Sequence, residues 1–199
     1  MSGATGRGPG RPRDPAADTA ILEATLTLLA EHGYTGLTTD AIAATAGVSK
    51  ATIYRRWSSK QQVVLAAVGS LANRVPAPDT GDLRRDLTAI ADGLAAVFSA
   101  PATGRLVGAL VERLLHDEEM AAALRGGFLT ERRAAARTAM VRGRQRGQVR
   151  DDADLDTAID LLAAPFYYRV LITGEPIDAK LAEGVVDVTL AYLRPLPRT

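Results

Sequence analysis

The chain has 199 residues and a net charge of +1, because 24 Lys and Arg side chains stand against 23 Asp and Glu. It contains no Cys, which excludes disulfide scaffolds, thiol nucleophiles and cysteine-ligated zinc. No apolar stretch is long enough to span a bilayer and the N-terminus lacks the apolar segment of a signal peptide, so we expect a cytoplasmic protein with no membrane partner.

Residues 14–74 have the periodic apolar positions of helices, with a capping residue before each helix and Gly after two of them. Residues 1–74, which include the N-terminal segment before this region, hold 8 basic and 5 acidic side chains, a net of +3, whereas residues 75–199 have a net of −2. The predicted helices are 14–33, capped by Asp14 with Pro15 in its first turn and ended by Gly33; 38–47, capped by Thr38 and ended by Gly47; 50–57, capped by Ser49; and 59–74, capped by Ser59.

The segment 75–81, Val-Pro-Ala-Pro-Asp-Thr-Gly, breaks the helical pattern and predicts a boundary between domains 14–74 and 75–199. Beyond it the pattern stays helical, without the sustained alternation of a strand, so we expect an all-α fold. Gly126 and Gly127 predict a break, and Pro165 predicts a kink. The predicted helices are 82–98, 102–115, 118–146, 154–173 and 178–194.

The last two predicted helices each carry two apolar faces, although a surface helix needs only one. We expect one face to pack inward and the other to meet a second copy across a two-fold axis, giving a homodimer. A thicker core within one chain is the alternative. The predicted dimer residues are Leu161, Tyr168, Val185, Val188 and Tyr192.

Residues 38–60 match the geometry of a helix-turn-helix, with a short helix, a Gly-containing turn and a second short helix that has an exposed basic face. Ile53 and Trp57 are four residues apart, so they share the face that would hold the second helix to the first. The opposite face would then enter the major groove of DNA. Spacing alone equally allows a helical hairpin with a solvated charged face.

The region from Ile21 to Leu71 resembles the N-terminal DNA-binding domain of TetR-family transcriptional regulators. The resemblance rests on HisGlyTyr, LeuThrThr, IleAlaAlaThrAlaGlyValSer, ThrIleTyrArgArgTrp and SerLys, in this order; Trp57 stands where the family usually has Phe. Residues 164–176 resemble, more loosely, the penultimate helix of many members. The resemblance implies a three-helix DNA-binding head, a connecting fourth helix and a larger helical domain that dimerises and binds a small-molecule effector. It therefore implies a repressor that a ligand releases from its operator.

Carried over position by position, the resemblance also implies which side chains meet double-stranded DNA. Some would read base edges, while others would hold phosphates and so position the protein. The residues are Lys50, Ala51 and Thr52 for the bases; Tyr54 and Lys60 for phosphates; Thr38, Thr39 and Ser49 for further phosphate contacts; and Arg55 and Arg56 for added charge at the DNA face.

Residues 1–13 are rich in Gly, Pro and Arg and have no aliphatic run, so we expect a flexible basic tail. Arg11 or Arg13 could enter the minor groove beside the helix-turn-helix, as short basic arms do. A disordered terminus that does not touch DNA is an equal alternative.

The C-terminal domain offers an effector pocket lined by large apolar side chains, which favours an apolar or aromatic small molecule. Simple core packing is the alternative for each of these residues. The pocket residues are Leu94, Phe98, Leu110, Leu114, Phe128 and Phe166, with Glu112 and Arg169 as polar anchors.

Signals for catalysis and for cofactors are poor, and we expect neither an enzyme nor a metal site. His116 precedes three acidic residues, but consecutive residues point in different directions around a helix, where acids suit its N-terminus. Two other classes stay open. A ligand-independent architectural DNA-binding protein would share the basic head, and an enzyme could use the C-terminal pocket.

Overall fold

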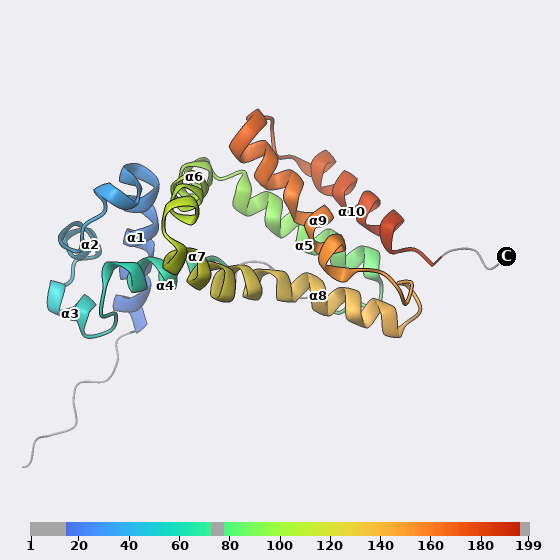
Figure 1. The fold of residues 1–199 in the computed structure, drawn as a ribbon, viewed down its shortest axis with the longest axis horizontal. Coiled ribbons are helices and arrows are strands. Elements are labelled where there is room, and N and C mark those ends of the chain that lie inside the picture. Colours follow the sequence, from blue (N-terminus) through green and yellow to red (C-terminus); the bar gives the residue numbers. More distant parts are fainter. Residues whose placement is uncertain (1–14, 73–77, 196–199) are drawn as a thin grey trace, which may run out of the picture.

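The computed structural model describes residues 15–72 and 78–195, and this part of the chain is helical throughout, with no strand (Figure 1). The predicted all-α fold is therefore confirmed. The elements are α1 (Pro15–Gly36), α2 (Thr39–Ala46), α3 (Lys50–Tyr54), α4 (Lys60–Ala72), α5 (Leu83–Phe98), α6 (Pro101–His116), α7 (Glu118–Leu124), the π-helical turn η1 (Arg125–Leu129), α8 (Thr130–Gln145), α9 (Leu155–Tyr168), the π-helical turn η2 (Arg169–Thr173) and α10 (Ala179–Leu193).

The caps predicted around the helix-turn-helix are confirmed. The Thr38 hydroxyl accepts a hydrogen bond from the Ala41 amide at 3.1 Å, and α2 ends at Gly47 in the left-handed conformation, with φ 65°. The Ser49 hydroxyl accepts from the Thr52 amide at 3.2 Å and begins α3. These hydrogen bonds satisfy backbone amides that have no partner within the helix, so α2 and α3 begin directly after their capping residues.

Two helices of the head end at other residues than predicted. The chain turns at Gly33, with φ 67° and ψ 179°, and helical structure then resumes to Gly36. α3 stops at Tyr54 rather than at residue 57, because the amides of Arg56 and Trp57 both donate to the Ile53 carbonyl at 2.9 Å. The third helix therefore closes in a tight turn that leads directly toward α4.

The break predicted at Gly126 and Gly127 is confirmed by η1, which separates α7 from α8. Glycine has no Cβ and therefore adopts the altered backbone of such a turn readily, whereas in a regular α-helix it is destabilising. Further along, α9 continues through Pro165 to Tyr168 and then widens into η2. A kink at Pro165 stays a prediction.

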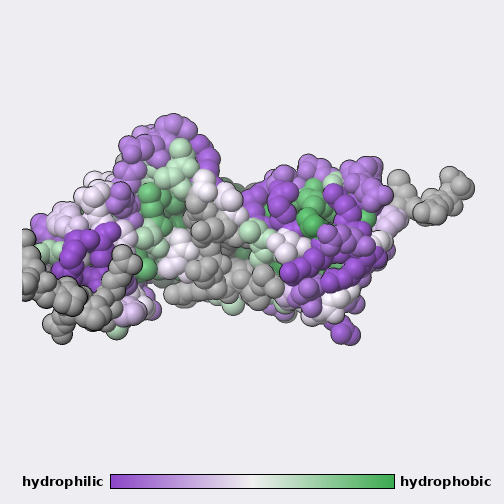
Figure 2. Space-filling view, turned by 90° about the horizontal axis from the view of Figure 1, so that it is seen from below, coloured by the Kyte–Doolittle hydropathy of each residue, from purple (hydrophilic) through white to green (hydrophobic). Residues whose placement is uncertain are grey.

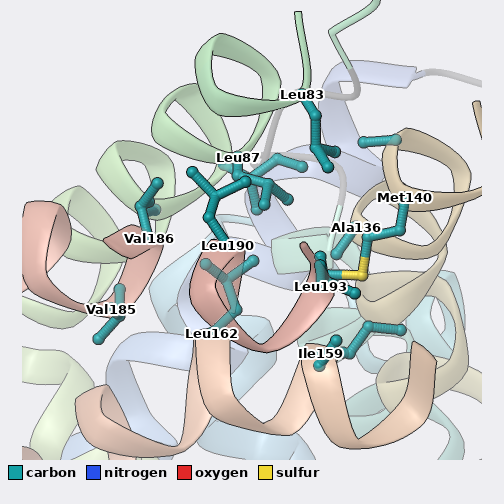
Figure 3. Packing of buried hydrophobic residues seen from close by; sticks show 14 of the residues in the cluster. Leu83, Leu87, Ala136, Met140, Ile159, Leu162, Val185, Val186, Leu190 and Leu193 are labelled. Atoms are coloured by element: carbon teal, nitrogen blue, oxygen red, sulfur yellow. The ribbon is translucent and has the colours of Figure 1, made fainter. Parts of the chain in front are cut away.

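Two hydrophobic cores organise the molecule, which is elongated, with α1–α3 at one end and α5, α8, α9 and α10 toward the other (Figure 1). In the head, α1–α4, the side chains of Ile21, Ile42 and Ile53 are completely buried. In the C-terminal half, residues from α5, α8, α9 and α10 converge on one another (Figure 3). Leu87 and Met140 are completely buried there.

Helices α6 and α7 connect these two cores. Leu106, Met120 and Leu124 pack into the same cluster as the apolar residues of α1 and α4. The Arg105 guanidinium also donates to the Ala30 carbonyl of α1 at 3.2 Å. Figure 2 shows a patch of hydrophobic residues between the left end and the middle of the molecule. Apolar packing thus crosses the predicted boundary at residue 75, and the domain limits stay a prediction.

No single helix among the described residues is both long and apolar enough to cross a membrane; one pair bent by 89°, Leu83–Phe98 with Ala102–His116, reaches that length and apolar composition only in combination. No group of three or more His, Cys, Asp or Glu side chains in the described ranges is arranged to hold a metal ion. Beside His116, the Asp117 carboxylate instead caps α7 by accepting from the Met120 amide at 3.0 Å.

Candidate nucleic-acid interface

Helix α3 lies on α2 through one buried face and presents its other face to solvent. Ile53 is completely buried in the head's core, and Trp57 packs against the same cluster from a half-buried position. This is the anchoring that the spacing predicted. Because α3 is held by its inner face, its N-terminal residues point outward together, where a DNA groove can reach them.

The N-terminus of α3 gathers short polar side chains in a fixed geometry. The hydroxyls of Ser49 and Thr52 are 2.9 Å apart, and the Ser49 hydroxyl also accepts a hydrogen bond from the Thr52 amide. Between them, Ala51 is exposed and offers only a methyl group. A hydroxyl pair beside an exposed methyl group can meet base edges by hydrogen bonds and by contact with a thymine methyl.

Lys50 carries the charge at this helix end, and it has a partner that the sequence did not reveal. Its ammonium is 2.9 Å from the Asp40 carboxylate on α2. The hydrogen bond that Lys50 donates to Asp40 raises the pKa of Lys50 above its ordinary value, so this side chain stays charged. The contact joins residues ten positions apart in the sequence, which no helical spacing relates.

The second contact between these helices joins two hydroxyls. The Tyr54 hydroxyl donates to Thr39 Oγ1 at 3.5 Å, a long bond. Thr39 is 8% exposed, whereas Tyr54 is 47% exposed. Tyr54 is therefore open to a phosphate, and Thr39 lies behind it, where it orients the phenol.

Arg56 and Lys60 bind the head itself. Arg56 forms an ion pair with Asp18 of α1, with its side chain only 14% exposed, and also donates to the Thr52 carbonyl at 3.3 Å. The Lys60 ammonium donates to two backbone carbonyls, those of Tyr34 and Leu37, each at 3.0 Å. Both cations therefore hold neighbouring elements of the head together. Residue spacing could not predict this role, because every residue has a backbone carbonyl and the sequence does not show which one accepts.

The remaining predicted DNA residues divide into exposed and undescribed positions. Thr38, Ser49 and Arg55 are exposed, although the hydroxyls of Thr38 and Ser49 already cap helices. Arg11 and Arg13 lie outside the described residues. The candidate surface, called the reading face below, consists of the exposed Lys50, Ala51, Tyr54 and Arg55 and the half-buried Thr52.

Two hollows lie among the helices of the C-terminal half. The larger, about 210 Å³, is bounded by α5, α8 and α9 and is lined mainly by apolar side chains such as Ile90, Leu94 and Ile159. The smaller, about 70 Å³, lies where α4, α5, α6 and α7 meet α9. Leu129 and Tyr167 line both hollows, so these two side chains form the wall between them.

The predicted pocket residues are only partly brought together there. Leu94 lines the larger hollow, while Phe98, Leu110 and Leu114 line the smaller one. Phe166 is completely buried in the core and lines neither.

Neither predicted polar anchor faces the hollows. Glu112 is exposed, and Arg169, the first residue of η2, lines a groove on the outer sides of α9 and α10 and donates to the Pro176 carbonyl. The side chain of Phe128 lies outside the described residues.

A cluster of paired charges borders the larger hollow. Arg133 of α8 forms ion pairs with Asp160 and, at 2.9 Å, with Asp156, and Arg137 also pairs with Asp156. The hydrogen bond from Arg137, joined by that from Arg133, holds the pKa of Asp156 below its ordinary value. The hydrogen bonds that Arg133 donates to Asp160 and Asp156 likewise raise the pKa of Arg133. These pairs fasten α8 to α9 beside the larger hollow, which Arg133 and Asp160 line.

A wide groove of about 1020 Å³ runs along the outer sides of α9 and α10. Leu161, Tyr168, Val185 and Val188 line it, with Tyr168 59% and Val188 56% exposed. Tyr192 lies apart from the groove, with the Arg150 guanidinium 5.1 Å above its ring. Four of the five predicted dimer residues therefore share one apolar surface, called the α9–α10 groove below.

Comparison with known families matches most of the chain. Residues 21–67 match the family described as bacterial regulatory proteins, tetR family, and residues 77–189 match the tetracyclin repressor-like C-terminal domain. The HTH-type transcriptional regulator YdeS of Bacillus subtilis is 38% identical over 178 residues, or 89% of each chain.

Two further relatives extend this likeness. The DNA-binding transcriptional repressor TetR of Mycobacteroides abscessus is 32% identical over 188 residues, covering 92% of this chain and 97% of that one. The crystal structure of the TetR family transcription regulator SCO0332 superimposes with a TM-score of 0.72 at 32% identity, over 90% of this chain and 99% of that chain. Sequence and three-dimensional structure thus point to the same family.

Proposed function

Because the chain belongs to the TetR family of HTH-type transcriptional regulators, we propose that it is a repressor that binds an operator as a homodimer and leaves it when a small apolar or aromatic effector binds. The observation that carries this proposal is the reading face. Lys50 and Tyr54 are exposed on a short helix whose opposite side is anchored by the buried Ile53. Such a regulator acts in the cytoplasm, where the chromosome lies.

Within the reading face, the residues divide by what they can recognise. Ala51 and the Thr52 hydroxyl have the size and polarity to contact base edges, and Lys50 can donate to guanine acceptors. The Tyr54 hydroxyl and the Arg55 guanidinium suit phosphates, which hold the protein in register without reading sequence. Lys60 and Arg56 support this surface from behind, through Leu37 and Asp18.

The homodimer brings two reading faces to one operator. The α9–α10 groove is the surface that we assign to the second copy, because it is apolar, wide and exposed at Tyr168 and Val188. A two-fold interface uses the same patch on both partners, so a single groove suffices. Operator half-sites then lie about one helical turn, 10–10.5 base pairs, apart or at a multiple of it.

The small hollow offers a route from effector to DNA. Leu71, at the end of α4, lines it together with Leu106 of α6, and Leu106 also packs into the head's core. A ligand that enlarges this hollow pushes on α4 and α6, both of which contact α1. The resulting movement of the head changes the separation of the two reading faces, which is the coupling that release requires.

Selection of bound sequences from a random DNA pool tests the proposal. The purified full-length chain should enrich a two-fold symmetric sequence whose half-sites keep one spacing. Lys50→Ala should change the enriched bases, whereas Tyr54→Phe should keep them and only lower the yield of bound DNA. A pool from which no sequence is enriched over repeated rounds would overturn the proposal of a sequence-specific regulator.

A further inference from the structure

The side chains around the two hollows differ in whether their polar atoms are already used. Besides Tyr167, the polar residues that line them are Arg133, Asp160 and Thr103. Arg133 and Asp160 bind each other. The Thr103 hydroxyl donates to the Val97 carbonyl at 2.6 Å. A ligand that takes the donor of Thr103 or Arg133, or the ion-paired oxygen of Asp160, therefore displaces a bond within the protein.

Tyr167 is the exception. Its ring packs edge-on against Phe98, with 4.7 Å between the centroids, so the ring has a fixed position. Its hydroxyl has no hydrogen-bond partner among the residues that the structure describes. A phenol can both donate and accept one hydrogen bond. In a wall shared by two apolar hollows, it is the polar group best placed to receive a ligand atom.

The ion pairs beside the larger hollow also restrict the charge of a ligand that binds there. Arg133 and Arg137 are balanced by Asp156 and Asp160. An anionic ligand that took Arg133 would leave a carboxylate without its partner, and a cationic ligand that took Asp160 would leave the guanidinium without one. A neutral ligand leaves all of these pairs in place.

We infer that the effector is an uncharged, largely apolar ring compound with one hydrogen-bonding oxygen or nitrogen, and that Tyr167 recognises this atom. The inference rests on the proposed function, because it names the effector of that regulator. The hollows of about 210 Å³ and about 70 Å³ together fall just below the usual range of roughly 300–1,000 Å³ for small-molecule sites, so the site suits a small ligand. One or two fused rings fill such a space.

Calorimetric titration of the full-length chain with three compounds of one skeleton tests this inference. The probes are 2-naphthol, which is neutral with one hydroxyl; naphthalene, which has no hydrogen-bonding atom; and 2-naphthoate, which is an anion. We expect 2-naphthol to bind about 2- to 10-fold more tightly than naphthalene, the usual range for one hydrogen bond. We expect 2-naphthoate to bind more weakly than either.

Two matched variants assign the effect to one hydroxyl. Tyr167→Phe keeps the ring and should abolish the preference for 2-naphthol over naphthalene. Tyr192→Phe makes the same change on α10, at a residue that lines neither hollow nor the α9–α10 groove, so it should keep that preference. Circular dichroism melts of both variants check that the fold is intact. Tightest binding of 2-naphthoate, a preference that survives Tyr167→Phe, or no binding of any probe would each overturn the inference.

Fluorescence anisotropy with DNA on the same preparations separates this inference from the proposed function. If the chain binds DNA specifically but shows no preference among the probes, the ligand inference is overturned and the regulator stands. If Tyr167 discriminates the probes but the chain binds no DNA, the ligand site is supported and the regulator is overturned.

Discussion

The ammonium nitrogen of Lys60 is 3.0 Å from the carbonyl oxygen of Leu37. This contact ties the first residue of α4 to the residue just before the cap of α2. Leu37 itself is almost completely buried, so its carbonyl has a fixed position. One side chain thus holds the start of α4, the connecting helix, to the start of the helix-turn-helix. We therefore expect a movement of α4 to displace the start of α2.

Lys60→Ala should destabilise the head and weaken binding to all DNA sequences alike. The substitution leaves the carbonyls of Tyr34 and Leu37 without their charged donor, which costs about 1–3 kcal/mol. Thermal unfolding measures the loss of stability, and anisotropy titrations on several DNA sequences measure the loss of affinity. A variant that keeps its stability but prefers a different sequence would show that Lys60 reads bases instead.

Asp40→Asn should strengthen binding to nonspecific DNA and so reduce the ratio of specific to nonspecific affinity. The change frees the Lys50 ammonium for phosphates, because it removes the carboxylate that accepts its hydrogen bond. We expect nonspecific affinity to rise about 1.5- to 5-fold. Asp92→Asn, at an exposed position on α5, removes the same charge away from the reading face and serves as the control.

A double-mutant cycle decides whether Asp40 acts through Lys50. In a Lys50→Ala background, Asp40→Asn should no longer change nonspecific affinity, because the ammonium that it would release is absent. If the gain persists without Lys50, the carboxylate acts by repelling phosphates directly, and the ion pair has no part in specificity.

Val188→Glu should convert the homodimer into monomers and thereby abolish tight operator binding. A carboxylate in the middle of the α9–α10 groove would be buried without a partner in the dimer, which is strongly unfavourable. Light scattering after size-exclusion chromatography measures the mass. Val141→Glu places the same charge on α8, where Val141 is 40% exposed, and should leave the mass unchanged. The mass of a dimer for both variants would place the interface elsewhere.

Asp156→Asn should lower the stability of the fold at neutral pH but not in strong acid. Arg137 and Arg133 hold the pKa of Asp156 below its ordinary value of 3.8. A depressed pKa contributes stability above the unfolded pKa, and this contribution is lost as the pH falls through the still lower folded pKa. The melting temperatures of the wild type and the variant should therefore differ at pH 7 and converge well below pH 3.8. A difference that persists at low pH would contradict this.

Much of this fold follows from local sequence signals. Caps at Thr38 and Ser49, the left-handed Gly47 and the break at Gly126 act within a few residues, so they can be read directly from the chain. The buried Ile53 follows from helical spacing in the same way. Local signals therefore gave the elements and the anchored face of α3.

The contacts that complete the site depend on which elements meet in space. Lys50 forms an ion pair with Asp40, ten residues away in the sequence, and Arg56 forms one with Asp18 on another helix. Helical periodicity relates neither pair. It likewise assigned Arg169 to an inner pocket, whereas the structure places it on the outer groove, because α9 is apolar on both faces and periodicity does not say which face turns inward.

Fluorescence anisotropy on the DNA upstream of the protein's own gene and of the divergently oriented neighbour tests the central claim most directly. The titration is run across a salt series with nonspecific competitor DNA. The account predicts saturable binding that survives the competitor and weakens steeply as salt rises, because phosphate contacts supply much of the affinity. Binding that the competitor removes completely, on these and on selected sequences, would contradict a sequence-specific regulator and would favour a ligand-independent architectural DNA-binding protein.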